Sequence, residues 1–330
     1  MSNILKPLDI GILNLHNRLV MPPMATAKAK DNGEVSEDIL SYYDEKSKGG
    51  NISLIIIEHS YIAEQGKASK NQLSIADDKL VEELKKLSST IQKNGSKTAM
   101  QINHAGSAAK REVTGMDPIA PSPVMNPRLG SEIPNELTTE EIKRIVNEFK
   151  DAAIRVKQAG FDAVEIHSAH GYLLNQFFSP LTNKRTDEYG GDLLGRIKIH
   201  KEVIKAVREA VGDSYPILLR LGACDYMDGG TTIEDSVAAS VEFEKAGVDI
   251  LDISGGLCGY DVPSLKGQGY FSPLSEEIKK AVSIPVILTG GVTDIYAAED
   301  LLAQEKADLI GVGRAIYKDS NWASKIDKFF

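Results

Sequence analysis

The sequence predicts an α/β fold, a single (β/α)₈ TIM barrel that spans residues 1–330 as one domain. Short runs rich in valine, isoleucine and leucine recur eight times along the chain. They are continuously apolar rather than alternating, which is typical of parallel strands buried on both faces. Amphipathic stretches with helical periodicity separate them, and a barrel of about 250 residues plus insertions fits a chain of 330 residues.

The predicted strands alternate with helices from start to finish, which favours a closed barrel over a doubly wound open sheet. An open sheet would also need a Gly-x-Gly-x-x-Gly pattern after its first strand, and the sequence has none there. The eight predicted strands are residues 19–24, 54–62, 97–104, 163–169, 216–222, 250–256, 285–291 and 309–315.

Three helices are predicted from their end signals and apolar spacing. Thr138 and Glu141 form a capping box, and Gly160 ends the same helix. A second helix stops near Gly95, and a third follows the Thr pair at 231–232. Apolar residues recur on one face of each helix: Ile142, Ile145, Val146, Phe149, Ala153 and Val156 in the first, Leu80, Leu84, Leu87 and Ile91 in the second, and Val237 and Val241 in the third.

The net charge of −9 argues against nucleic acid or an anionic membrane as the main partner. No run reaches the ~18 consecutive apolar residues of a membrane-spanning helix, and the first residues lack the pattern of a secretory signal. Cys224 and Cys258 have no CxxC or zinc spacing, which favours free thiols in a reducing cytosol and leaves a redox role for Cys258 open. We therefore expect a cytoplasmic protein that acts on a small molecule.

Two long insertions follow predicted strands, at residues 105–137 and 171–196. Loops of this length are usually functional, and the active sites of such barrels lie at the carboxyl ends of the strands. Gly290–Gly291 and Gly313–Arg314 end the last two strands, where backbone N–H groups and an arginine can hold a phosphate. The alternative is that these glycines serve only tight turns.

His167, His170 and Tyr172 cluster at the end of the fourth predicted strand. A metal site would need a third ligand, and Glu165 is expected to alternate to the opposite face of the strand. We therefore predict no metal here. The two histidines are interpreted as hydrogen-bond donors to a substrate oxygen, with Tyr172 as an acid.

At these residues the sequence resembles the Old Yellow Enzyme family of FMN-dependent NAD(P)H oxidoreductases. The resemblance covers nearly the whole chain and is strongest in GFDAVEIHSAHGYLLNQFFSPLTNKRTDEYGGDLLGR, residues 160–196. Three other segments match the family's order and spacing along the chain: HNRLVMPPM (16–24), QINHAG (101–106) and ADLIGVGRA (307–315).

The resemblance implies a ping-pong ene-reductase with FMN as cofactor and NADH or NADPH as reductant. Hydride passes from the nicotinamide to flavin N5, and then to the β-carbon of an activated C=C bond such as an α,β-unsaturated carbonyl. His167 and His170 would hold the acceptor oxygen, where donors stabilise developing negative charge, and Tyr172 would protonate the α-carbon. Enone, dienoyl thioester, nitro and azo acceptors all fit. The resemblance also implies a homo-oligomer.

Carried over residue by residue, the resemblance also implies how FMN is held. Gln101 would bond the pyrimidine edge of the flavin, and Arg220 would lie near N1 and O2 and favour the anionic reduced form. The phosphate would be held by Gly290, Gly291, Gly313 and Arg314, and the residues backing or flanking the ring would be Pro23, Met24, Ala25, Thr26 and His59.

Three features depart from the family pattern. Ala25 stands where threonine or cysteine is frequent, so Thr26 is the candidate to supply that side chain, and His59 stands where a small residue is usual. The chain ends in SKIDKFF, without the C-terminal arginine that some members insert into a neighbour's site. Its length and its two cysteines predict neither the iron–sulfur cluster nor the second flavin domain of longer relatives.

Two other functions are weighed against the ene-reductase. A flavin-free, phosphate-binding TIM-barrel lyase or isomerase would need a Schiff-base lysine or paired carboxylates at the strand ends, and none is predicted there. A non-catalytic flavin-binding protein would hold FMN without turnover. The set of His167, His170 and Tyr172 argues against that reading.

Overall fold

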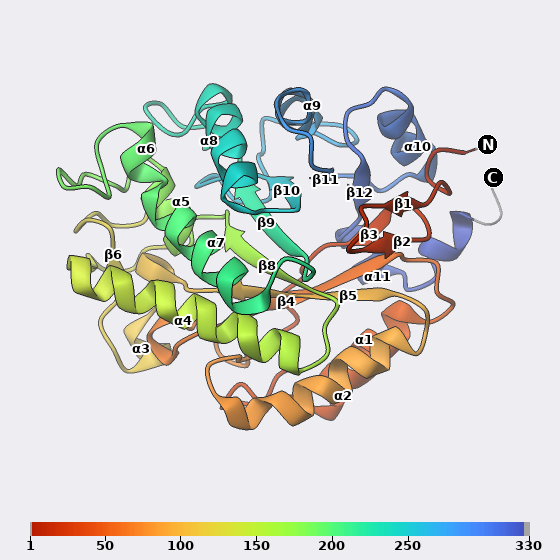
Figure 1. Ribbon diagram of the computed structural model, residues 1–330, viewed down its shortest axis with the longest axis horizontal. Coiled ribbons are helices and arrows are strands. Elements are labelled where there is room, and N and C mark those ends of the chain that lie inside the picture. Colours follow the sequence, from red (N-terminus) through yellow and green to blue (C-terminus); the bar gives the residue numbers. More distant parts are fainter. Residues whose placement is uncertain (1, 327–330) are drawn as a thin grey trace.

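The computed structural model describes residues 2–326, so the last four residues of the SKIDKFF ending lie outside the described part of the chain. Parallel strands close into a barrel in the order β10-β11-β12-β3-β4-β5-β8-β9, which confirms the predicted fold (Figure 1). The barrel strands are β3 (Leu19–Met21), β4 (Leu54–Tyr61), β5 (Lys97–Asn103), β8 (Ala163–Ser168), β9 (Ile217–Gly222), β10 (Ile250–Ser254), β11 (Val286–Thr289) and β12 (Leu309–Gly311).

A helix on the outside of the barrel follows each of these strands (Figure 1). Their inner faces form the larger apolar core of the protein, between the helices and the strands. The helices are α1 (Glu37–Ser47), α2 (Val81–Gln92), α4 (Thr139–Gln158), α7 (Lys198–Val211), α8 (Ile233–Ala246), α9 (Ser272–Ala281), α10 (Ile295–Ala303) and α11 (Arg314–Lys318). Within residues 2–326, no helix has the length and apolar character needed to cross a membrane.

The end signals read from the sequence are present in the structure. Thr138 and Glu141 form the capping box of α4, and Gly160 follows the helix with a φ of +76°. The apolar face predicted for α8 is confirmed in part, because Val237 packs against the core. Its buried residues are Ser236, Ala239, Ser240 and Phe243, whereas the two valines at 237 and 241 are only partly buried.

Some predicted strands run past the observed ends. β3 stops at Met21 because Pro22 and Pro23, which follow it, have no backbone N–H to donate to a neighbouring strand. A short hairpin near the start of the chain was not predicted. It pairs β1 (Leu8–Asp9) with β2 (Asn14–Leu15), and its apolar side chains pack into the cluster inside the barrel.

The inside of the barrel changes from apolar to polar along the strands. Ala99, Ala163, Leu218, Ile250 and Ile287 lie in the apolar interior cluster. Because side chains of a strand alternate, the residue two positions further along each strand also points inward. These residues form a polar layer at the carboxyl ends of the strands, which consists of Gln101, Glu165, Arg220, Asp252 and Thr289.

The two insertions contain short elements of their own. Residues of the first insertion pack on Tyr172 in a small apolar cluster that includes Ala105, Ala108 and Leu129. The insertions contain η3 (Gly106–Ala108), α3 (Arg111–Thr114), β6 (Ile119–Ala120), β7 (Asn135–Glu136), α5 (Leu173–Phe178) and α6 (Leu193–Arg196). Outside them lie the short helices η1 (Glu64–Gly66), η2 (Asp78–Leu80) and η4 (Ala323–Lys325).

Replacing the capping residue of α4 tests its contribution to stability. Thr138→Ala removes the acceptor of the Glu141 N–H, so we expect the free energy of unfolding to fall by about 1 kcal/mol in urea denaturation. Thr139→Ala is the matched control, because the cap bond is made by Thr138 and not by its neighbour. Equal losses in the two variants would contradict the capping role.

Candidate active site

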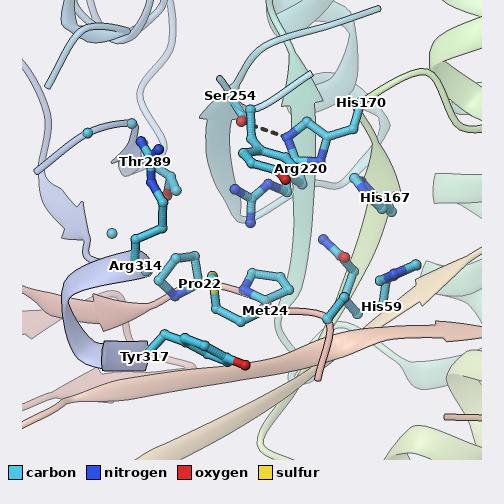
Figure 2. A pocket seen from close by; sticks show the side chains of 18 of the residues that line it. Pro22, Met24, His59, His167, His170, Arg220, Ser254, Thr289, Arg314 and Tyr317 are labelled. Atoms are coloured by element: carbon cyan, nitrogen blue, oxygen red, sulfur yellow. Dashed lines mark hydrogen bonds between the residues drawn. The ribbon is translucent and has the colours of Figure 1, made fainter. Parts of the chain in front are cut away.

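A cavity of about 530 Å³ opens at the carboxyl ends of the barrel strands. Figure 2 shows His59, His167 and His170 along one side of it, with Thr289 and Arg314 on the other. Every residue predicted for the site lines this cavity except Thr26: Pro23, Met24, Ala25, His59, Gln101, His167, His170, Tyr172, Arg220, Gly290, Gly291, Gly313 and Arg314.

Thr26 is the one predicted site residue that does not line the cavity. Its hydroxyl donates a 2.5 Å hydrogen bond to Glu58 Oε2 and is therefore already engaged. Ala25 does line the cavity, but with a methyl group only. The expectation that Thr26 replaces the side chain missing at position 25 is therefore not met.

A β-bulge in β4 determines which side chain enters the cavity. The pairing of β4 with β5 shifts register between Ile57 and Ser60. Strict alternation from Ile56 would point Glu58 inward, and a bulge re-aims the residues that follow it. His59 consequently lines the cavity, while the Glu58 carboxylate contacts Thr26 outside the lining.

The hydrogen bonds of His59 fix where its proton lies. Gln72 accepts from the backbone N–H of Ala68 through Oε1, so its Nε2 is the donor that faces His59 Nδ1 at 3.1 Å. Asn103 Nδ2 lies 3.2 Å from the same nitrogen. Nδ1 is therefore an acceptor, and the proton of His59 is on Nε2. Burial lowers the pKa of His59 to about 4, so the ring is neutral at neutral pH.

His167, His170 and Tyr172 converge as the sequence suggested. The ring of His167 has its centroid 5.2 Å from that of His170 and 5.1 Å from that of Tyr172. Tyr172 stacks on His59 at 5.2 Å. Burial lowers the pKa of both His167 and His170 and raises the pKa of Tyr172. At neutral pH the cluster therefore presents neutral imidazoles and a protonated phenol.

Two residues hold His170 in place. Its Nε2 lies 2.8 Å from Ser254 Oγ, the dashed line in Figure 2. Its backbone has a φ of +60°, which is uncommon for a residue with a side chain. Arg128, from the first insertion, donates to the carbonyl oxygen of His170 and at 3.2 Å to that of Leu257. The insertion thus supports the strained turn that carries the histidine.

The polar layer forms part of the cavity floor. The expectation for Glu165, which belongs to this layer, is wrong. Glu165 does not alternate to the opposite face from His167, because residues two apart on a strand share a face. It is fully buried, and its Oε1 accepts a 2.7 Å hydrogen bond from Gln101 Nε2. Arg220 Nη1 lies 3.2 Å from Asp252 Oδ2, and Thr289 donates to Asp252 Oδ1 at 2.8 Å. The barrel therefore does hold two carboxyl groups, which the sequence analysis did not foresee.

The end of the cavity formed by β11 and β12 is shaped for close backbone approach. Gly291 has a φ of +73°, and a Cβ there would lie 2.3 Å from the Tyr270 ring. A Cβ at Gly313 would lie 2.8 Å from Met24 Sδ. Arg314 Nη2 donates to the Tyr270 hydroxyl at 3.0 Å. Glycines beside an arginine leave backbone N–H groups accessible to a phosphate.

Sequence reasoning missed several residues that line the cavity. Ser254 and Thr289 follow from the alternation rule, because each continues the inward face of its strand. Arg128, Tyr260 and Tyr270 line the cavity from loops, where strand periodicity gives no signal.

Neither cysteine forms a disulfide, and Cys258 is the one for which a redox role was left open. Both cysteines are free, and Cys258 is absent from the cavity lining. Burial raises the pKa of Cys258 to about 12, which keeps it in the less reactive thiol form. Among residues 2–326, no group of three or more His, Cys, Asp or Glu side chains is arranged to hold a metal ion.

Comparisons of the sequence and of the structure with known proteins point to one family. The NADH:flavin oxidoreductase / NADH oxidase family matches residues 3–329. An NADPH dehydrogenase of Clostridium acetobutylicum is 40% identical over 306 residues, 92% of this chain and 88% of the relative. The solved structure of an old yellow enzyme homologue from Zymomonas mobilis is 26% identical with a TM-score of 0.87, covering 99% of this chain and 92% of that one.

An NADH oxidase of Thermoanaerobacter brockii is 42% identical over 324 residues. That alignment covers 96% of this chain but 49% of the relative. The chain thus spans about half the length of this curated relative.

The buried carboxyl of Glu58 predicts a pH dependence of stability. Burial raises its pKa from an ordinary 4.5 to about 7 in the folded protein. The folded state then binds more protons than the unfolded state between these values, so the free energy of unfolding falls as the pH rises from about 4.5 to 7. At about 1.4 kcal/mol per pKa unit the fall is of the order of 3 kcal/mol.

Glu58→Gln removes this titrating group and should make the fall in stability shallower in urea unfolding curves recorded across that range. Glu82→Gln, at an exposed position of α2, should retain the wild-type slope. A wild-type slope in Glu58→Gln would show that another group is responsible.

Proposed function

Because the chain belongs to the NADH:flavin oxidoreductase / NADH oxidase family, we propose that it is an FMN-dependent ene-reductase with a ping-pong cycle. Membership confirms the resemblance to the Old Yellow Enzymes and makes FMN the cofactor, with NADH or NADPH as reductant. One observation supports the proposal most. A single cavity contains the cluster of His167, His170 and Tyr172 and also the glycines and Arg314 at the ends of β11 and β12, which can hold a phosphate. Bound FMN would take hydride from the nicotinamide and pass it to an activated C=C bond.

The donors of the cavity fit FMN. Arg220 Nε is buried and has no hydrogen-bond partner in the described chain, so a polar ligand atom would relieve it. Gln101 and Arg220 would hold the ring. The cradle that would hold the phosphate consists of Gly290, Gly291, Gly313 and Arg314.

We assign His167 and His170 to the oxygen of the acceptor. Both rings are buried and neutral, so each can donate one N–H without bringing a charge into the cavity. Two preset donors stabilise the negative charge that develops on a carbonyl oxygen as hydride reaches the β-carbon. In this assignment the Ser254 hydroxyl donates to His170 Nε2, which holds the ring and leaves its one N–H on Nδ1 for the acceptor oxygen.

We assign Tyr172 as the acid that protonates the α-carbon. Burial raises its pKa, so the phenol keeps its proton at neutral pH and can transfer it. Its position beside His167 places proton donor and oxygen-binding group on the same side of the cavity. This arrangement suits α,β-unsaturated carbonyls and related acceptors.

A flavin-free lyase or isomerase is less well supported. The carboxyl groups of Glu165 and Asp252 are completely buried in the barrel, and Asp252 is paired with Arg220. General base catalysis needs a group within reach of the substrate. No lysine of residues 2–326 lines the cavity to form a Schiff base.

The oligomeric state and location are part of the proposal. We propose that residues 1–330 act as one FMN-binding domain in a cytoplasmic homo-oligomer. The free thiols of the described chain fit a reducing compartment. Oligomerisation is supported by the family resemblance alone, so sedimentation that shows a monomer at micromolar concentration would contradict it.

Separating the two half-reactions tests the catalytic assignments. In Tyr172→Phe the proton donor is lost, so stopped-flow reoxidation of the reduced enzyme by an enone should slow. Reoxidation by a quinone and reduction by NAD(P)H need no carbon protonation and should stay within a few-fold of wild type. His167→Ala should slow enone reoxidation by about 10²–10³, the usual loss for one oxyanion donor.

Tyr260→Phe is the matched control, because Tyr260 also lines the cavity but is 59% exposed. It should behave as wild type with both acceptors. Wild-type enone reoxidation in Tyr172→Phe would mean that another group is the acid. Equal losses in both half-reactions would indicate a disturbed flavin pocket.

A further inference from the structure

Beneath the cavity the barrel buries two carboxyl groups and one guanidinium. Glu165, Arg220 and Asp252 come from three adjacent strands, β8, β9 and β10. Both carboxyl side chains are completely buried and Arg220 is 3% exposed. One positive charge at the edge of the cavity therefore accompanies two acids that have no contact with solvent, and the burial of an unpaired ion is costly. The cluster is neutral only if one of the two acids holds a proton.

The contacts of the two acids differ. Asp252 has a charged partner and a donated hydrogen bond. Its Oδ2 lies 3.2 Å from Arg220 Nη1 in an ion pair without hydrogen-bond geometry, and the Thr289 hydroxyl donates to its Oδ1 at 2.8 Å. Glu165 contacts only the neutral amide of Gln101, and its Oε2 has no hydrogen-bond partner in the described chain. A charged partner and a donated hydrogen bond both favour ionisation. Burial raises the pKa of both carboxyl groups. In Asp252, Arg220 and the Thr289 hydroxyl oppose this rise, whereas in Glu165 the charge of Asp252 adds to it and raises the pKa well above its ordinary value.

We propose that Asp252 is a residue that tunes the flavin: ionised and paired with Arg220, it offsets the guanidinium charge beside the ring, while Glu165 stays protonated and carries no charge. The inference rests on the proposed function, in which Arg220 holds the ring of FMN. Reduction adds negative charge to the flavin, which a nearby cation stabilises and a nearby anion opposes. Asp252 therefore holds the midpoint potential below the value that Arg220 alone would give.

The geometry supports a measurable effect of Asp252 on the midpoint potential of the flavin. Asp252 is in direct contact with the guanidinium, and Thr289, which donates to its other oxygen, lines the cavity together with Arg220. Figure 2 shows Arg220 extending between Thr289 and the histidines. Charges in a buried site are weakly screened and act over several ångströms. The pair of acids also provides an internal comparison, because an amide can replace either carboxyl with almost no change of shape.

The experiment measures the midpoint potential of the FMN-loaded protein by anaerobic optical titration against a reference dye. Asp252→Asn should favour the reduced flavin by at least about tenfold, which is about 30 mV upward for a two-electron couple. Glu165→Gln is the matched control and should leave the potential within about twofold of wild type in the same equilibrium. Arg220→Ala should move the potential in the opposite direction to Asp252→Asn.

Asp252→Ser removes the same charge with a smaller side chain and serves if Asp252→Asn does not fold. An upward shift in either Asp252 variant, without one in Glu165→Gln, supports the proposal. An unchanged potential in an Asp252 variant that binds FMN, or equal shifts at the two positions, overturns it. Wild-type protein that takes up no FMN would instead contradict the proposed function, so the two failures are distinguishable.

Discussion

The pairing of β12 with β3 closes the barrel, and the site depends on that closure. In a closed parallel barrel every strand ends at the same rim, and its side chains alternate strictly between the interior and the helices. Apolar residues such as Ala163 and Leu218 fill the lower interior. Two residues further on, the ionisable side chains of Glu165 and Arg220 lie in the upper interior without any change in the backbone. One period therefore sets both the core of the fold and the floor of the cavity.

Departures from this regularity supply the chemistry. The bulge in β4 turns His59 into the cavity, and the left-handed turn at His170 brings a second imidazole beside His167. The first insertion holds that turn through Arg128, so an irregular loop keeps the His170 imidazole in place at the cavity. Burial keeps the imidazoles neutral and the phenol of Tyr172 protonated, which is the state that the proposed oxygen binding and proton transfer require. The strained features thus lie at the mouth of an otherwise regular barrel.

The sequence was sufficient for features set by local pattern and insufficient for those set by register. Continuous apolar runs predicted the barrel strands, and the capping box at Thr138 predicted the start of α4. The prediction for Glu165 was wrong because residues two apart on a strand share a face. The prediction for Thr26 failed because its hydrogen bond to Glu58 depends on the bulge in β4, which has no local sequence signal. Arg128 and Tyr260 reach the cavity from loops, whose course depends on tertiary packing. The ion pair of Arg220 with Asp252 joins neighbouring strands and follows once inward faces and strand order are both known.

The central claim is that one cavity takes reducing equivalents from a nicotinamide and delivers them to a C=C bond through FMN. The most direct measurement follows the visible spectrum of the FMN-loaded wild-type protein in the absence of oxygen. The account predicts that NADH or NADPH bleaches the flavin absorbance and that a simple cyclic enone then restores it, with the saturated ketone as product. Absorbance that no nicotinamide bleaches, or that no activated alkene restores, would contradict the account.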